Sequence, residues 1–195
     1  MSDNRILTAE QARVLPWRNG GGFTREWLIE PSGASIEQLD FDWRISAAAV
    51  NEDGPFSRFP GYQRVLILTS GNGLLLTHGD EAPVELRRGT VHHFAGGVPS
   101  HARLLDGPVE DFNVIYRAER VQIETDVVRG ETRTMAATPL RLFLLVLAGT
   151  CELNGQRIGA GCAWTGSAAS LSALDARQGE AILVRAHALD ATMRP

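Results

Sequence analysis

Polar side chains alternate with apolar ones in three short segments, as they do when a strand gathers each kind on its own face. The clearest case is Phe41-Asp-Trp-Arg-Ile-Ser46, in which three apolar residues separate three polar ones. Similar alternation surrounds Asp111 and Asn113, and again Thr24 and Glu26. The polar members of the three segments are Thr24, Glu26, Asp42, Arg44, Ser46, Asp111 and Asn113.

If these faces line the inside of a barrel, their polar groups must pair with one another or with a ligand, because unpaired buried polar groups are costly. Arg44 offers a planar fork that suits a carboxylate, and Arg64 can act as a second clamp. Glu26 or Asp111 can hold an N–H group of the same ligand. The competing interpretation is an antiparallel sheet with one solvated face, which alternates in the same way.

A run of glycines precedes these strands, at Asn19-Gly-Gly-Gly22. Successive backbone N–H groups in such a loop can bind an anion, so Asn19 and Gly21 join the candidate ligand-binding residues. An ordinary Gly-rich turn is the alternative. Phe56 and Phe59, in the Pro- and Gly-containing segment before Arg64, are either walls of the site or packing aromatics.

Composition excludes several classes of function. The 195 residues carry 19 basic and 23 acidic side chains, and all 19 basic ones are Arg. Without Lys, neither Schiff-base chemistry nor a nucleotide-binding P-loop is available. The net charge of -4, with no basic run, argues against nucleic acid or an anionic membrane as a partner. A coding bias toward Arg accounts for most of the 19.

The N-terminal residues lack the pattern of a secretory signal, and the longest apolar run, Leu142–Gly149, is too short to cross a bilayer. We therefore expect a cytoplasmic protein. Cys151 and Cys162 flank an Asn154-Gly155 hairpin signal, whose two-residue turn places Cys151 opposite Ile158. Both cysteines are expected to be reduced, buried and unpaired with each other.

Most of the chain consists of short β-type runs between Gly, Pro, Asn and Asp, which predicts an all-β fold. One helix is expected, at Thr8–Leu15, with Thr8 as its N-cap. The order of strand, Gly turn and meander beginning at Arg64 recurs from Arg141, so the chain is an internal repeat of two halves.

This repeat resembles the double jelly roll of the bicupins. More specifically, the sequence is similar to the HutD/Ves family in four motifs: Trp17–Glu26, Phe41–Ser46, Asp53–Gly61 and Leu105–Asn113. The resemblance implies an all-β, cupin-like double jelly roll with at most one or two short helices. It also implies an association with bacterial histidine utilisation and a small-molecule binding role.

We expect a first half at residues 1–118 that holds the pocket, and a second half at 119–195. The second half is expected to be mainly structural, tightly packed on the first or supporting a homodimer. The candidate ligand-binding residues are Asn19, Gly21, Thr24, Glu26, Arg44, Ser46, Arg64, Asp111 and Asn113.

Metal-binding cupins use a His-x-His pair, but His92 and His93 are adjacent and would point to opposite faces of a strand. His78, His101 and His187 stand alone in the sequence, so we expect no metal and no other cofactor. His101 is retained as an acid–base candidate because Gly97–His101 opens a strand near the other motifs.

Three functions remain open. The protein binds a small carboxylate of histidine degradation, such as urocanate or a formylated glutamate, as a sensor or buffer. Alternatively it is a metal-independent enzyme on the same ligand, with Glu26, Asp111 or His101 as acid or base. The third possibility is a purely structural interaction protein, whose polar strand faces are exposed to solvent.

Overall fold

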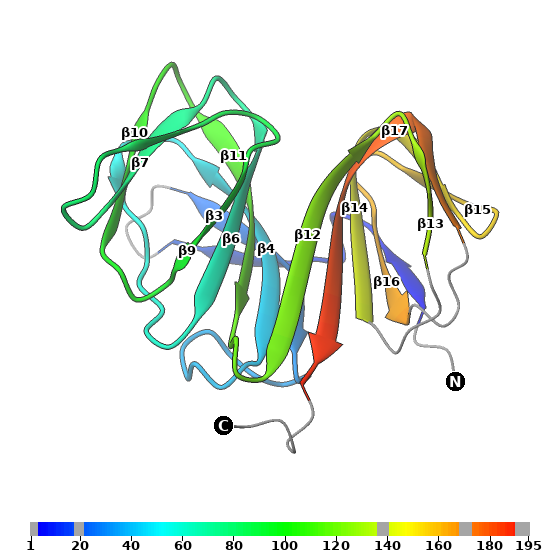
Figure 1. The fold of residues 1–195 in the computed structure, drawn as a ribbon, viewed down its shortest axis with the longest axis horizontal. Helices are drawn as coiled ribbons and strands as arrows, with labels where there is room; N and C mark the ends of the chain where they lie inside the picture. Colours follow the sequence, from blue (N-terminus) through cyan, green and yellow to red (C-terminus); the bar gives the residue numbers. More distant parts are fainter. Residues whose placement is uncertain (1–3, 18–21, 136–140, 168–172, 190–195) are drawn as a thin grey trace. The chain divides into compact units, whose positions relative to one another are not determined.

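The computed structural model describes residues 4–17, 22–135, 141–167 and 173–189 of the chain. All regular elements in these ranges are β-strands, which confirms the all-β prediction (Figure 1). The chain forms two compact units. We call Arg13–Ala118 the central unit, and Met1–Ala12 together with Glu119–Pro195 the terminal unit.

Two sheets build the central unit (Figure 1). One has six strands in the order β2-β3-β4-β11-β6-β9, and the other has four in the order β5-β10-β7-β8. Their bounds are β2 Arg13–Pro16, β3 Phe23–Glu30, β4 Trp43–Val50, β5 Gly54–Pro55, β6 Gln63–Ser70, β7 Leu74–His78, β8 Val84–Leu86, β9 Val91–Ala95, β10 Ser100–Leu104 and β11 Val109–Tyr116.

Apolar side chains from both sheets meet in one core cluster. Leu66 and Leu68 come from β6 of the larger sheet, whereas Leu74 and Leu76 come from β7 of the smaller one, and all four are fully buried. The sheet face that carries Leu66 and Leu68 is therefore the inner face of the unit. Side chains in register with them on neighbouring strands point inward as well.

Strand β3 contains a bulge that decides which of its residues reach this face. Glu26 pairs with Ser46, but the next pair is Leu28 with Ile45, so Trp27 is an extra residue without an opposite partner. A bulge shifts the alternation of side chains by one position. Glu26 therefore shares the inner face with Ser46, and Ile29, not Leu28, lies in register with Arg44 on that face.

The terminal unit is a seven-stranded sheet with the path β1-β16-β14-β17-β12, to which β13 and β15 are attached. Its core contains Leu142, Leu144, Trp164 and Leu183. The strand bounds are β1 Arg5–Leu7, β12 Val121–Arg129, β13 Thr132–Thr134, β14 Arg141–Leu153, β15 Gln156–Gly159, β16 Ala163–Ser167 and β17 Ala173–Ala188.

Two sequence predictions fail at the N-terminal side. Thr8–Leu15 is not a helix: Gln11 donates to the Thr8 carbonyl and accepts from the Thr8 N–H through its side chain, and this single turn leads directly into β2. The pairing of β2 with β3 overrides the local helical preference. The first residues also belong to the terminal unit and not to a 1–118 half, because β1 pairs with β16.

The cysteine prediction is confirmed in part, because the burial expected for both thiols is found at Cys151 but not at the half-buried Cys162. Cys151 lies opposite Ile158 across the Asn154-Gly155 turn, and both turn residues have positive φ, as a type I′ turn requires. Both cysteines are free thiols. Cys151 is fully buried, and burial raises the pKa of its thiol to about 11.

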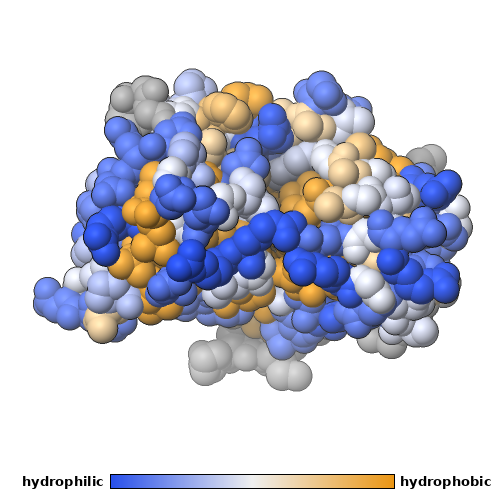
Figure 2. Space-filling model, turned by 90° about the horizontal axis from the view of Figure 1, so that it is seen from above, coloured by the Kyte–Doolittle hydropathy of each residue, from blue (hydrophilic) through white to orange (hydrophobic). Residues whose placement is uncertain are grey.

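No helix in the described ranges has the length and apolar character needed to span a membrane. Figure 2 shows one face of the molecule, on which hydrophilic side chains predominate and smaller hydrophobic areas lie between them. The exposed large apolar side chains in the described ranges are Val14, Phe23, Val84, Val98 and Leu189.

Candidate functional site

A buried polar cluster occupies the inner face of the central unit. Strand register places Glu26, Ser46, Asn113, Leu66 and His92 in one row across β3, β4, β11, β6 and β9. The next row contains Arg44, Ile115, Arg64 and Phe94. The cluster thus gathers polar side chains from strands that are far apart in the sequence.

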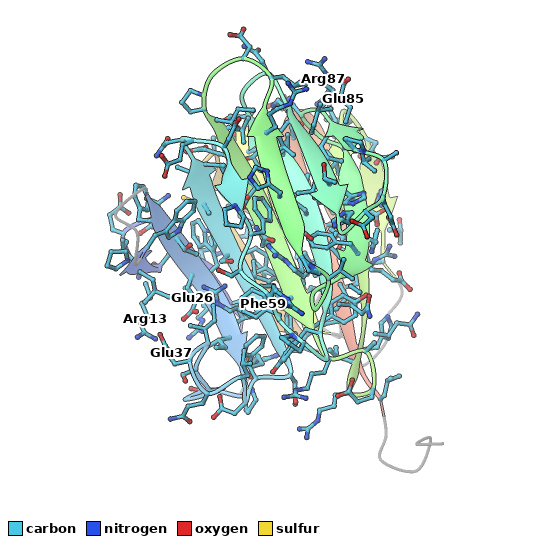
Figure 3. All side chains as sticks on the ribbon, turned by 90° about the vertical axis from the view of Figure 1, so that its left-hand side faces the viewer. Arg13, Glu26, Glu37, Phe59, Glu85 and Arg87 are labelled. Carbon is cyan, nitrogen blue, oxygen red and sulfur yellow. The ribbon has the colours of Figure 1, made fainter. Side chains whose placement is uncertain are left out.

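Arg44 is held on one side of this cluster by β3 and β4. Its Nε donates to Glu26 Oε2 at 2.6 Å and its Nη1 donates to Ser46 Oγ at 3.1 Å. Arg44 and Glu26 are only 3% and 6% exposed, so this ion pair is buried. The other Glu26 oxygen lies 3.8 Å from the exposed Arg13 guanidinium, next to which Figure 3 shows it. The Arg44 Nη2 donates to no described residue.

Arg64 is held on the other side by β6 and β11. Its Nη2 donates to Asn113 Oδ1 at 2.6 Å, and the Asn113 amide donates to Asp111 Oδ1 at 2.5 Å. The Arg64 Nη1 donates to the Ser57 carbonyl at 3.2 Å. Its Nε, although buried, has no hydrogen-bond partner among the described residues.

Three phenylalanine rings surround the Arg64 guanidinium. Its Cζ lies 5.2 Å from the ring centroid of Phe56, 5.5 Å from that of Phe59 and 5.0 Å from that of Phe94. These distances are typical of cation–π contacts, which favour the flat guanidinium over the round ammonium of Lys. Phe56 and Phe59 are therefore walls of an arginine cage in addition to packing aromatics.

The charges of the cluster are not fully balanced at neutral pH. Burial raises the pKa of Asp111 to about 7, and this rise is opposed by the Arg64 charge and by hydrogen bonds from Asn113 and the Ala48 backbone. Burial lowers the pKa of Arg64 to about 10; Asp111 opposes this shift and Arg44 adds to it. When Asp111 is protonated, two guanidinium groups face only the Glu26 carboxylate.

A pair of histidines extends the polar cluster toward the smaller sheet. His78 Nε2 lies 2.9 Å from His92 Nε2, and His78 Nδ1 lies 2.8 Å from Ser100 Oγ. His78 and Ser100 are buried, whereas His92 is half-buried. Phe94 contacts both imidazoles, with centroid separations of 4.6 Å to His78 and 5.6 Å to His92. The same ring thus touches the histidine pair and Arg64.

Six of the candidate ligand-binding residues lie in the buried cluster: Glu26, Arg44, Ser46, Arg64, Asp111 and Asn113. Thr24 shares the β3 face, but its hydroxyl accepts a hydrogen bond from Trp17 Nε1 at 2.9 Å and joins none of the ion pairs. Asn19 and Gly21 lie outside the described residues.

The structure contradicts the choice of His101 as an acid or base of this site. His101 is exposed, whereas its neighbours Ser100 and Ala102 are buried. Because successive side chains of β10 alternate, the residues that point inward are Ser100 and Ala102. The candidate acid or base groups of the cluster are thus Glu26, Asp111 and the His78–His92 pair.

His78 and His92 are the site residues that sequence reasoning missed. The signal for His78 was present, because it continues the alternation of Leu74 and Leu76, whose face is apolar. The sequence correctly predicted that His92 and His93 point to opposite faces of their strand. What the sequence did not show is that β7 and β9, which belong to different sheets, bring the two imidazoles together.

A metal centre does not fit the donors present. In the described part of the chain, no three His, Cys, Asp or Glu side chains lie close enough to hold one metal ion. The two convergent imidazole nitrogens are hydrogen-bonded to each other.

A separate cavity of about 420 Å³ lies in the terminal unit, lined by Thr150, Cys151, Glu152, Arg157, Asp175, Arg177 and Gln178.

The fold is shared with solved cupin-like structures. An oxalate decarboxylase from Lactobacillus farciminis, in complex with formate, has a TM-score of 0.62 at 10% identity, covering 93% of this chain and 85% of that one. An Escherichia coli pirin in complex with nickel(II) has a TM-score of 0.68 at 8% identity, covering 93% of this chain and 98% of that one. At these identities the similarity confirms the cupin-like fold and says nothing about ligands.

Nearer relatives are similar along most of the chain. A HutD structure from Pseudomonas fluorescens SBW25, solved in a formate condition, is 27% identical with a TM-score of 0.84, covering 96% of this chain and 100% of that one. An uncharacterised 21.2 kDa Pseudomonas putida protein of the hutC 3' region is 35% identical over 73% of this chain and 74% of its own length. Protein Ves of Cronobacter sakazakii is 34% identical over 72% of this chain and 74% of its own.

The HutD family model matches residues 9–187, which cover most of both units and include the whole buried cluster. Family membership therefore rests on most of the chain and not on one motif. The chain belongs to the HutD/Ves family, whose HutD members are linked to the histidine utilisation operon.

Proposed function

We propose that this protein binds a small carboxylate at the inner face of its central unit, in the cytoplasm, and thereby senses or buffers an intermediate of histidine degradation. The ligand's carboxylate would lie between Arg44 and Arg64. Urocanate and formylated glutamate are the candidate ligands, and the family's link to histidine utilisation is what favours them.

The observation that carries the proposal is spare donor capacity on two buried arginines. Arg64 has a buried Nε with no acceptor among the described residues, and the Arg44 Nη2 has none either. An unsatisfied buried donor such as the Arg64 Nε is costly, and a carboxylate supplies the acceptor that it lacks. Protonation of Asp111 leaves one excess positive charge, which an anion would neutralise.

Thermal shift with a panel of ligands tests this proposal. Urocanate, formylglutamate, histidine and formate are each titrated into the wild type and into Arg44→Lys and Arg64→Lys. A ligand at about 100 times its Kd should raise Tm by roughly 5–10 °C. The Lys variants should lose most of that rise, because an ammonium cannot replace the bidentate fork.

Arg103→Lys is the matched control, because Arg103 is exposed on β10 of the same unit. It should respond to ligand as the wild type does. If no carboxylate raises the wild-type Tm, or if both buried Lys variants respond fully, the carboxylate site is wrong.

The second candidate function is an enzyme, which the raised pKa of Asp111 favours. A carboxyl with a pKa of about 7 can give or take a proton at neutral pH. Incubating the bound ligand with the protein and following it by proton NMR separates the two functions. A ligand that is recovered unchanged supports binding, whereas turnover that Asp111→Asn abolishes supports catalysis.

A further inference from the structure

The two imidazoles of the His78–His92 pair meet edge to edge. Their ring planes differ by only 11°, and their centroids lie 5.2 Å apart while the two Nε2 atoms lie 2.9 Å apart. In stacked rings the centroids would lie about as close together as the facing atoms. Here the centroids are farther apart than the two Nε2 atoms by about the width of one ring, so the rings meet at their edges and are not stacked face to face. The contact is therefore an N–H···N hydrogen bond, in which one nitrogen donates and the other accepts.

Ser100 determines which nitrogen donates. Its hydroxyl donates to the Val98 carbonyl at 3.1 Å, and a carbonyl can only accept, so the single hydroxyl proton is used there. His78 Nδ1 must then carry a proton and donate to Ser100 Oγ. In neutral His78, Nε2 is consequently the acceptor, and His92 Nε2–H is the donor.

The hydrogen-bond series from Ser100 through His78 ends at the His92 ring, whose second nitrogen is Nδ1. Because neutral His92 has its proton on Nε2, its Nδ1 is a bare acceptor, and it accepts from no described residue. Burial lowers the pKa of both imidazoles, which keeps them neutral. Among the charged and titratable groups around them, Glu81 opposes the pKa shift at His78 and Arg64 strengthens it. At His92, first His78 and then His93 strengthen the shift.

His92 lies within reach of a ligand held by Arg64. On the inner face, Leu66 pairs with Asn113 on one side and with His92 on the other, while Arg64 is two residues before Leu66 on the same strand. Arg64 is thus a diagonal neighbour of both residues, at a spacing of roughly 7–8 Å between Cα atoms that long side chains can bridge. The diagonal contact with Asn113 is made, at 2.6 Å.

We propose that His92 Nδ1 accepts a hydrogen bond from an N–H group at the far end of the carboxylate ligand, so that the site selects carboxylates that carry such a donor. The inference rests on the proposed carboxylate function and names its ligand class. Arg44 and Arg64 take the anionic end, and the histidine pair, whose tautomer Ser100 sets, takes the N–H end.

A pair of matched ligands tests this inference. Urocanate and 3-(3-furyl)acrylate share the acrylate carboxylate and a planar five-membered ring, but only urocanate has a ring N–H. At pH 8, calorimetry on the wild type should show urocanate binding about tenfold tighter, the effect of one hydrogen bond. In His92→Phe, which keeps a flat ring but removes the acceptor, the two ligands should bind within about twofold of each other.

His93→Phe is the control, because His93 is exposed on the other face of β9, and it should keep the tenfold preference. Equal binding of both ligands to the wild type, or a preference that survives in His92→Phe, overturns the inference but leaves the carboxylate site standing. If neither ligand binds, the inference fails, whereas the carboxylate site fails only if no carboxylate of the thermal-shift panel raises the wild-type Tm.

Nitrogen NMR of the ligand-free protein tests the assigned tautomers of His78 and His92 directly. Long-range proton–nitrogen spectra should show His92 protonated at Nε2 only and His78 at Nδ1 only. In Ser100→Ala, which frees His78 Nδ1, these tautomers should become mixed and the preference for urocanate should fall. A His92 ring protonated at Nδ1 in the wild type would remove the acceptor and overturn the inference.

Discussion

The Asp111 carboxyl is buried and accepts hydrogen bonds from the Asn113 amide and the Ala48 backbone. The positive charge of the buried Arg64 also acts on it. Burial disfavours its charged form more strongly than these partners favour it, so its pKa rises to about 7. This carboxyl adjusts the charge of the arginine cluster within the physiological range. An anion that binds beside Arg64 should raise the pKa of Asp111 further and bring a proton with it.

The raised pKa of Asp111 predicts how stability changes with pH. The folded-state pKa lies above the ordinary value of 3.8, so this contribution to the free energy of unfolding is full below pH 3.8 and is lost as pH rises to about 7. Urea unfolding of wild type and Asp111→Asn between pH 4 and pH 8 should show the wild type losing a few kcal/mol relative to the variant, on the order that about three pKa units imply.

Asp80→Asn, which removes a carboxyl from an exposed turn, is the control for the loss of one negative charge. A difference between wild type and Asp111→Asn that stays constant from pH 4 to pH 8 would mean that Asp111 titrates normally in the folded protein.

At the scale of elements, the pairing of the two long strands β14 and β17 is interrupted by two irregularities. Their register shifts between Val146 and Ala148 and again between Thr150 and Glu152, and Gly149 lies between the two shifts with a φ of +66°. A Cβ on Gly149 would come within 2.1 Å of the Gln178 carbonyl oxygen. A close backbone approach and a left-handed conformation both require glycine here.

Three alanine substitutions separate these two requirements. Gly159→Ala, with open space and no positive φ, should leave the free energy of unfolding within about 0.5 kcal/mol of wild type. Gly161→Ala, with a φ of +78° and open space, should cost about 1–2 kcal/mol. Gly149→Ala should cost clearly more than Gly161→Ala, because the β17 backbone must also move. Chemical unfolding measures all three, and equal costs at 149 and 161 would show that the close approach is relieved cheaply.

At the scale of the whole molecule, the chain divides into units that do not follow the order of its two sequence repeats. The repeats suggested a boundary near residue 118, and the chain does pass from one unit to the other there, but it also does so after Ala12. The N-terminal segment belongs to the terminal unit because Ile6 pairs with Trp164 and packs against the Leu142 and Leu183 cluster.

This partition predicts where an N-terminal substitution will act. Ile6→Asn should speed hydrogen exchange at the amides of β16, because it removes an apolar contact from the adjacent edge strand. Exchange in β3 and β4 of the central unit should stay unchanged. Arg5→Ala, at an exposed position of the same strand, is the control and should alter neither region. Faster exchange in β3 without a change in β16 would contradict the partition.

The sequence by itself determined those features that depend on neighbours along the chain. Alternation in Phe41–Ser46 and Phe112–Tyr116 placed Arg44, Ser46, Asp111 and Asn113 on one face, since a strand has a period of two. The Asn154-Gly155 pair specified its turn because both residues tolerate positive φ. The absence of Lys identified Arg as the cation of any buried site.

Only the tertiary structure decided the features that depend on strand pairing. The turn at Thr8 became the approach to an edge strand instead of a helix, because pairing with β3 outweighs a weak local preference. His101 points outward and Ser100 inward because the register of β10 with β7 sets its alternation. The His78–His92 contact joins strands of different sheets, so no local spacing could reveal it. Side-chain periodicity is a local property of the chain, whereas the partners of each face are chosen by the packing of the whole sheet.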